Sequence, residues 1–249
     1  METLSPVLTR HRLGSLEVLA DRAAADRGWL VAFTDRTGGT SHRPYDSLNL
    51  SGRVGDDDAS VQANRDAVGE ALSFDPERLV LANQVHGSNL LEVAPRDAGV
   101  LGAADVLVVR KPGPIAAILT ADCAPVAVAG GDALAIAHAG WRGLAGGAIE
   151  RAIQAVGDPI AAWVGPCIHS CCYTVGADVV ERFRDGGLPV EAPDRVDPAR
   201  AAEAILRRSG VERLSIATEC TSCDPRYFSY RRDGVTGRQA GLVALLPSA

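Results

Sequence analysis

The sequence predicts a mixed α/β (α+β) fold, in which a layered, mixed β-sheet core is flanked by helices. Residues 78–140 are a series of short apolar runs separated by glycine and proline, which is typical of a sheet-rich core. Segments with helical spacing of apolar residues and with capping residues lie on either side. We find no linker-like composition, low-complexity tract or internal repeat, so we expect one domain over 1–249, and a division into two subdomains is left open.

The first half of the chain is expected to be rich in strands. Residues 29–36 form a strand that leads into a loop over 37–55, which glycine and proline mark. Apolar spacing over 58–72 predicts a helix with Asp58 or Ser60 as its cap. Six further strands are expected at 78–86, 89–94, 104–110, 114–121, 125–130 and 133–140.

In the second half, helices and strands alternate. Asp197 followed by Pro198 is a typical cap and first turn, and it begins a helix expected to end at Gly210. The other expected elements are a helix over 143–157, strands over 160–167 and 213–218, and a hairpin over 227–246 that turns at Asp233 and Gly234.

The composition limits the classes of function. A net charge of −6 and a pI near 5.4 argue against binding to nucleic acid or to an acidic membrane, and favour small-molecule partners. Residues 1–14 lack the apolar segment of a signal peptide, and no run reaches the roughly 18 apolar residues of a membrane span, so we expect a cytoplasmic protein. Because the cytoplasm is reducing, we expect the six cysteines to be free thiols, metal ligands or catalytic residues rather than disulfide partners.

Three side chains with metal-ligating chemistry fall at the ends of predicted strands: His86, Cys123 and His138. The ends of neighbouring strands can meet at one edge of a sheet, where two imidazoles and a thiolate would make a zinc site with an open fourth position. Their separations along the chain match no compact metal motif. The residues alone therefore leave three alternatives open: a metal site, a Cys123 thiolate with a histidine base, and side chains with only structural roles.

Several segments together carry a resemblance to a known family. They are NQVHG at 83–87, ADVLVV at 104–109, LTADCAPV at 119–126, IAHAGWRGLAGGA at 136–148, GPCIHSCCYTVG at 165–176 and FSYRRDGVTGRQAG at 228–241. In this order they resemble the bacterial family variously named polyphenol oxidase (laccase domain), peptidoglycan-editing factor and purine nucleoside phosphorylase. The similarity extends from about Phe33 to Arg238.

The resemblance implies that His86, Cys123 and His138 bind a zinc ion. It also implies phosphorolysis of adenosine, inosine and methylthioadenosine, with adenosine deamination as a further activity. The expected partners are therefore purine nucleosides and phosphate, and a homo-oligomeric state is left open. The segment over 165–176 departs from the family pattern at Cys167, His169, Ser170 and Thr174, which leaves any role of that loop open.

The competing names of this family demand different chemistry. A multicopper oxidase needs on the order of ten histidines, whereas this chain has five. A single copper in place of zinc would lack a methionine ligand, since Met1 is the only methionine, unless Gln84 replaced it. Peptidoglycan editing would correspond to amide hydrolysis by Cys123 with His138 as its base. A zinc-stabilised binding or regulatory protein is the alternative outside enzymology.

Further residues are candidates for binding the substrate or moving protons. Arg142, in a glycine-rich turn before a predicted helix, would bind phosphate, and Arg43 would bind phosphate or ribose. Asn49 and Gln84 are the other predicted substrate-binding residues. Asp122 would either transfer a proton or hydrogen-bond a ligand histidine or nearby backbone.

The other cysteines form two groups along the chain. Cys220 and Cys223 have CxxC spacing, but the spacing of Cys167, Cys171 and Cys172 is irregular. We therefore expect buried thiols here rather than a second metal site.

Overall fold

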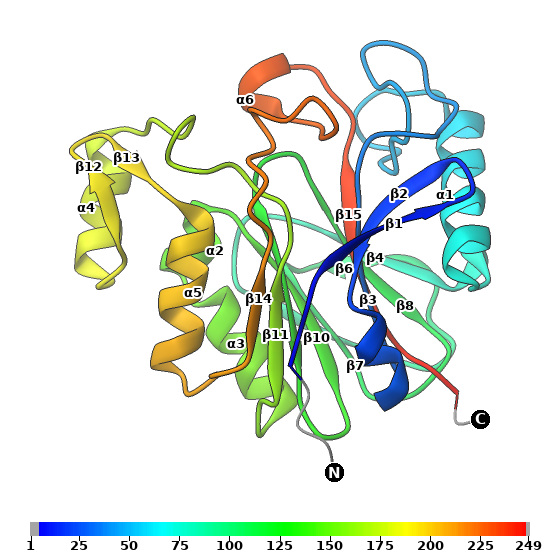
Figure 1. Cartoon of the computed structure of the whole chain (residues 1–249), viewed down its shortest axis with the longest axis horizontal. Helices are drawn as coiled ribbons and strands as arrows, with labels where there is room; N and C mark the ends of the chain where they lie inside the picture. Colours follow the sequence, from blue (N-terminus) through cyan, green and yellow to red (C-terminus); the bar gives the residue numbers. More distant parts are fainter. Residues whose placement is uncertain (1–4, 248–249) are drawn as a thin grey trace.

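In residues 5–247, which the computed structural model describes, two large β-sheets pack face to face (Figure 1). The first sheet has the order β1 (Thr9–Leu13), β2 (Leu16–Ala20), β3 (Trp29–Thr34), β15 (Gln239–Leu245), β8 (Ile115–Thr120), β4 (Leu79–Asn83) and β6 (Gly99–Ala103). The second sheet has the order β14 (Leu214–Ile216), β11 (Ala161–Val164), β9 (Ala124–Ala129), β10 (Leu134–Ala139), β7 (Val106–Val109) and β5 (Leu90–Val93). A small separate sheet consists of β12 (Val190–Ala192) and β13 (Arg195–Val196).

Helices lie on both sides of this pair of sheets. In Figure 1, α1 (Asp58–Leu72) lies beside the first sheet, and the other long helices lie on the far side of the second. These are α3 (Ala148–Val156), α4 (Ala177–Asp185) and α5 (Pro198–Arg208). The shorter helices are α2 (Trp141–Ala145), α6 (Tyr230–Asp233), η1 (Arg22–Arg27) and η2 (Pro76–Arg78). This layered arrangement confirms the predicted mixed α+β fold class.

The central strands are apolar, apart from His138 near the end of β10, because both of their faces are buried. Every residue of β9 and β10 is buried. Since side chains alternate between the faces of a strand, Leu134 and Ile136 enter the core between the two sheets. Ala135 and Ala137 point the other way, into the core formed with the helices. The six strands predicted between residues 78 and 140 are confirmed as β4, β5, β7, β8, β9 and β10.

Two predicted helices are confirmed, with one correction to the cap. Asp197 caps α5, where its carboxylate accepts hydrogen bonds from the backbone N–H groups of Ala199 and Arg200. The cap of α1 is Asp57, not Asp58 or Ser60. Asp57 has an extended backbone and accepts from the backbone N–H of Ser60 at 2.9 Å, as an N-cap residue must.

The predicted C-terminal hairpin is wrong. The hydroxyl of Ser229 accepts from the backbone N–H of Arg232 and begins the short helix α6. Gly234, at a φ of 69°, ends that helix instead of joining two strands. The chain then enters β15, which pairs with β3 and β8 in the middle of the first sheet. The helix predicted over 143–157 is also divided, because Gly146 and Gly147 separate α2 from α3.

The crossing between the two sheets gathers three strand ends at one place. The chain leaves β8 in the first sheet and enters β9 in the second across only residues 121–123. β4 is parallel to β8, so both strands end at the same edge. β10 is antiparallel to β9 and places His138 opposite Pro125. The topology therefore brings the segments that contain His86, Cys123 and His138 together.

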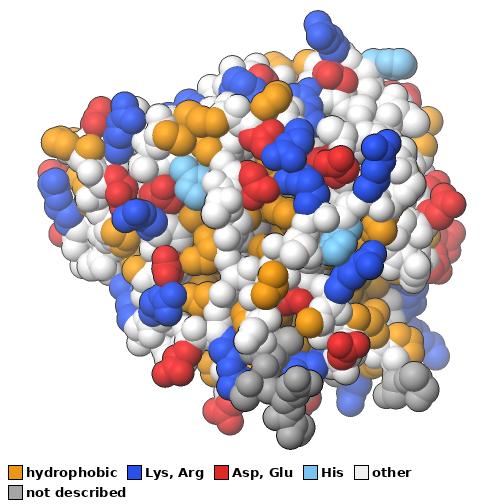
Figure 2. Space-filling model, viewed as in Figure 1, with side chains coloured by type: hydrophobic (Ala, Val, Ile, Leu, Met, Phe, Trp, Pro, Cys, Tyr) orange, Lys and Arg blue, Asp and Glu red, His pale blue; other side chains and the backbone are white. Residues whose placement is uncertain are grey.

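The surface is mixed in charge on the face that Figure 2 shows, where acidic and basic side chains are interspersed. Several of the charged groups form ion pairs, including Arg226 with Asp224 and Arg232 with Asp233. Across residues 5–247 we find no helix with the length and apolar character needed to traverse a lipid bilayer.

Candidate metal centre and pocket

The structure brings the three predicted metal ligands together. His86, Cys123 and His138 each offer one ligand atom, and these atoms lie within 4.8 Å of one another. The two imidazole rings have centroids 4.7 Å apart and planes at 73°. His138 is buried, Cys123 is half-buried and His86 is exposed. Two imidazoles and one thiolate are a donor set that suits zinc and leaves a fourth position open to a substrate.

Asp105, a residue not predicted from the sequence, organises two of these ligands. Its Oδ1 atom lies 2.8 Å from Nδ1 of His138, inside the protein. The same carboxylate accepts hydrogen bonds from the backbone N–H groups of Val85, His86 and Gly87. Burial opposes its charge, but His138 and these N–H groups hold the pKa of Asp105 below its ordinary value. A carboxylate that orients a ligand histidine is a common feature of metal sites.

The backbone around the ligands leaves room for them to approach one another. A Cβ atom added at Gly140 would lie 3.0 Å from Sγ of Cys123 and 3.3 Å from Cδ2 of His86.

His86 and Asp122 have φ angles of 60° and 99°, which side-chain-bearing residues rarely adopt. Such strained positions cluster at functional sites, where the surrounding fold enforces them.

The thiol and the buried imidazole stabilise each other's charged forms. Burial alone would raise the pKa of Cys123, but His138 and His86 lower it to about 6. Burial likewise opposes the imidazolium form of His138, whereas Cys123 and Asp105 raise its pKa to about 9. Cys123 is therefore a thiolate near neutral pH, which is the form that both a metal ligand and a nucleophile require.

These ligands lie in the wall of a cavity of about 540 Å³, a size typical of small-molecule sites. The cavity is rich in cations and aromatic rings: Arg53, Arg142, Arg231, Arg238, Trp141, Tyr173 and Tyr230 line it. Thr120 also lines it, and the buried Oγ1 atom of Thr120 has no hydrogen-bond partner among the described residues. Of these four arginines only Arg142 was predicted from sequence, because the other three come from segments distant from it in sequence.

Two of the predicted substrate-binding residues line this cavity. Arg142 is exposed, and its guanidinium lies 4.3 Å from the ring centroid of Trp141. Gln84 pairs with the backbone of Leu119, donating to its carbonyl at 2.8 Å and accepting from its N–H at 2.9 Å. The amide of Gln84 is thereby held at the end of β8.

The other two predicted residues are placed elsewhere. Arg43 lines a second cavity together with Arg36 and Asp233, and it does not line the cavity of the metal candidates. Asn49 is fully buried. Its side chain donates to Asp56 and to the carbonyl of Ser51, and it accepts from the backbone N–H of Arg238. Asn49 thus holds the neighbouring loops together and has no atom directed at the cavity.

Asp122 lines the cavity, but both of its carboxylate oxygens have partners. Oδ1 accepts from the hydroxyl of Thr221 at 2.7 Å, and Oδ2 accepts from the backbone N–H of Arg231 at 2.7 Å. This geometry matches the second of the two roles predicted for Asp122, hydrogen bonding to nearby backbone. The first role, proton transfer, would require a substrate atom to compete with these partners.

Comparison with known proteins places the chain in a family. A family model described as multi-copper polyphenol oxidoreductase laccase matches residues 30–246. The chain belongs to this laccase family. Its relatives in the family include proteins named purine nucleoside phosphorylase from Streptomyces coelicolor and Escherichia coli. The Streptomyces coelicolor protein is 39% identical, and the match covers 86% of this chain and 94% of that protein. The Escherichia coli protein is 34% identical, and the match covers 88% of this chain and 95% of that protein.

Solved structures agree with this family assignment. The crystal structure of YlmD from Geobacillus stearothermophilus has a TM-score of 0.86 and 30% identity, and the match covers 97% of this chain and all of that one. The crystal structure of a Bacillus licheniformis hypothetical protein, YfiH, has a TM-score of 0.84 and 30% identity, with 94% and 98% covered. The laccase family and its layered fold are therefore established for this chain.

Proposed function

We propose that this laccase-family protein is a zinc-dependent purine nucleoside phosphorylase acting on adenosine, inosine and methylthioadenosine, with adenosine deamination as a second activity. The observation that carries the proposal is the position of the two-histidine, one-cysteine cluster in the wall of a cavity lined by four arginines. The names of the relatives supply the substrate class.

His86, Cys123 and His138 would hold the zinc, with Asp105 fixing the orientation of His138. Their ligand atoms are close enough for one ion, and Gly140 provides the space that the cluster needs. Zinc bound there would supply a Lewis acid that polarises an oxygen or nitrogen atom of the substrate. Zinc suits this donor set better than a blue copper centre, since no methionine lies in residues 5–247.

The arginines would bind the phosphate that phosphorolysis consumes. Arg142 is exposed in the cavity and makes no ion pair among the described residues, so its guanidinium is available to an anion. Arg238 also lines the cavity, and burial lowers its pKa because desolvation disfavours the charged form; a bound anion would offset that cost. In the reaction a phosphate oxygen forms a bond to C1′ of ribose while the bond from C1′ to the purine nitrogen breaks and the base leaves with the electron pair.

The aromatic residues of the cavity would hold the purine. Trp141, Tyr173 and Tyr230 line the same cavity as the arginines, and every purine has a flat face that can stack on such rings. We assign Asp122 a positioning role, since its carboxylate joins the hydroxyl of Thr221 to the backbone N–H of Arg231, which also lines the cavity.

The test is an assay of the purified protein with each nucleoside, in the presence and absence of phosphate. Phosphorolysis predicts free base and ribose 1-phosphate only when phosphate is present, whereas deamination predicts inosine from adenosine without it. Cys123→Ala should lose turnover together with one bound zinc per chain. Full activity of Cys123→Ala would overturn the proposal.

A second candidate function follows from the acidic thiol. Cys123, with a pKa of about 6 beside His138, has the state of a nucleophile that would attack an amide, as peptidoglycan editing would require. Such a hydrolase would remain active after exhaustive chelation and would be blocked by alkylation of Cys123. Zinc bound without turnover of any nucleoside or amide would instead indicate a binding or regulatory protein.

A further inference from the structure

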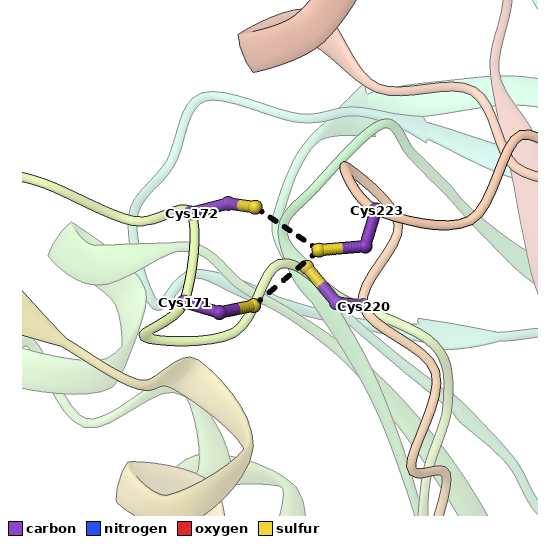
Figure 3. Close-up of side chains that lie close together, drawn as sticks. All are labelled: Cys171, Cys172, Cys220 and Cys223. Carbon is purple, nitrogen blue, oxygen red and sulfur yellow. Dashed lines mark hydrogen bonds between the residues drawn. The ribbon is translucent and has the colours of Figure 1, made fainter.

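Four cysteines outside the metal centre meet at one point. Cys171 and Cys172 lie in the loop between β11 and α4, and Cys220 and Cys223 lie in the loop after β14. Figure 3 shows the four side chains pointing toward one another from these two loops. Cys171 and Cys223 are exposed and Cys172 is half-buried, so the predicted buried thiols are wrong for this group; only Cys220 is buried.

The distances between the sulfur atoms suit one tetrahedral metal ion. The Sγ atom of Cys223 lies 3.2 Å from that of Cys172 and 3.5 Å from that of Cys171. All four sulfurs lie within 4.8 Å of one another, and all four are free thiols. A zinc–sulfur bond of about 2.3 Å gives a tetrahedron whose edge is about 3.8 Å. The two separations of 3.2 and 3.5 Å are a few tenths of an ångström shorter than that edge, and both are longer than a disulfide bond.

The backbone of the two loops gathers the sulfurs and places one hydrogen-bond donor on them. The N–H groups of Cys223 and Asp224 donate to the carbonyl of Cys220, so that the CTSC segment forms a tight turn with both sulfurs on one side. The backbone N–H of His169 points at Sγ of Cys220, at 3.4 Å. A donor on the sulfur stabilises its negative charge.

Cations border the cluster on both loops. Arg195 donates to the carbonyls of Ser170 and Cys171, and Arg231 donates to those of Cys172 and Thr174. Arg232 donates to the carbonyl of Thr221. Four thiolates around a divalent ion carry a net charge of about −2, which the guanidinium groups of Arg195 and Arg231 would offset, whereas Arg232 is ion-paired with Asp233.

We propose that Cys171, Cys172, Cys220 and Cys223 bind a second zinc ion, with a structural role. Four protein ligands close the coordination sphere, which distinguishes a structural zinc from a catalytic one. The ion would join a loop that lines the cavity to a loop that holds a residue of its lining. Tyr173 follows Cys172 and lines the cavity wall, and Thr221 follows Cys220 and holds Asp122. The second zinc would thereby fix one wall of the proposed active site.

Metal content tests this directly. The purified full-length protein, prepared with zinc under reducing conditions, is compared with Cys172→Ser/Cys223→Ser by elemental analysis. We expect the double variant to lose one zinc per chain, whether or not the first cluster is filled. The matched control is Cys167→Ala, which removes a buried cysteine outside both clusters and should keep all of its zinc. Equal zinc in the double variant and the wild-type protein would overturn the proposal.

A second measurement does not depend on the folding of the double variant. Cys123→Ala removes the only thiolate of the first cluster, so any absorption from thiolate-to-cobalt charge transfer in the cobalt-loaded variant must come from the four cysteines. We expect that absorption to be intense and to be accompanied by the visible bands of tetrahedral cobalt. A cobalt-treated Cys123→Ala protein without thiolate absorption, or a disulfide between these cysteines in freshly reduced protein, would refute the site.

Discussion

The Nδ1 atom of His138 lies 2.8 Å from Oδ1 of Asp105, and this hydrogen bond leaves Nε2 of His138 directed at the other two ligand residues. Because Asp105 also binds the backbone N–H groups of Val85, His86 and Gly87, one buried carboxylate sets the positions of both histidines. The candidate metal centre thus depends on a residue that supplies no ligand.

Asp105→Asn is expected to lower zinc affinity at the first cluster by about 10- to 100-fold. The amide can still accept from His138 through its oxygen, but its NH₂ group would face backbone N–H groups that now donate to a carboxylate. The Asp105 substitution is made in the Cys172→Ser/Cys223→Ser protein, which lacks the second proposed site. The zinc that this protein retains against a competing chelator then measures the effect at the first cluster alone. Asp132→Asn, in an exposed turn, is the control for the change in charge. Equal zinc affinity in the Asp105 variant would show that the carboxylate does not orient the ligand.

Gly140→Ala is expected to weaken the same site by about tenfold or more, since the new methyl group would be in close contact with Cys123 and His86. Gly140 has a φ of −70°, so alanine introduces no backbone strain there. Gly131→Ala places a methyl group in open space and serves as the matched control. Zinc affinity and nucleoside turnover should fall together in the first variant and stay unchanged in the second.

Arg142→Gln should raise the KM for phosphate by about 10- to 100-fold, the size expected when one hydrogen bond to a charged group is lost. The KM for the nucleoside should change much less, since the purine would be held by aromatic rings. Arg96→Gln, on an exposed turn, controls for the loss of one positive charge. The same assay on Arg43→Gln tests the predicted role of Arg43 in binding phosphate or ribose. Because Arg43 lines another cavity, we expect no change in the KM for phosphate or nucleoside.

Asp197 is expected to make the stability of the protein depend on acid pH. Burial opposes its charge, but His169 and backbone N–H groups lower the pKa of Asp197 to about 2. Because this pKa lies below the ordinary value of about 4, the stabilisation is fully present above pH 4 and is lost as the pH falls toward 2. His169, whose pKa is raised by Asp197, stays protonated throughout this range.

The corresponding variant is Asp197→Asn, since asparagine can also cap a helix. Urea unfolding of both metal-free proteins should give a difference in the free energy of unfolding that is larger at pH 6 than near pH 2, by about 2 kcal/mol. A difference that is the same at both pH values would mean that the charge of Asp197 contributes nothing to stability.

Much of the local structure could be predicted because it depends on neighbouring residues. Apolar runs such as those of β9 and β10 predict strands without any knowledge of which sheet the strands join. Asp197 caps α5 by accepting hydrogen bonds from backbone N–H groups only two and three residues away. The C-terminal hairpin failed because the partners of β15 are β3 and β8, which are distant in sequence. Asp233 and Gly234 instead end the short helix α6.

The same division holds for the candidate site. Residue chemistry and the family resemblance were enough to single out His86, Cys123 and His138, since imidazole and thiolate groups at strand ends are conspicuous in a chain with few of them. The part played by Asp105, the three additional arginines of the cavity and the meeting of Cys171 and Cys172 with Cys220 and Cys223 required the folded chain. These contacts join segments far apart in sequence, and their distances are set by how the two sheets and their loops pack, which no local pattern encodes.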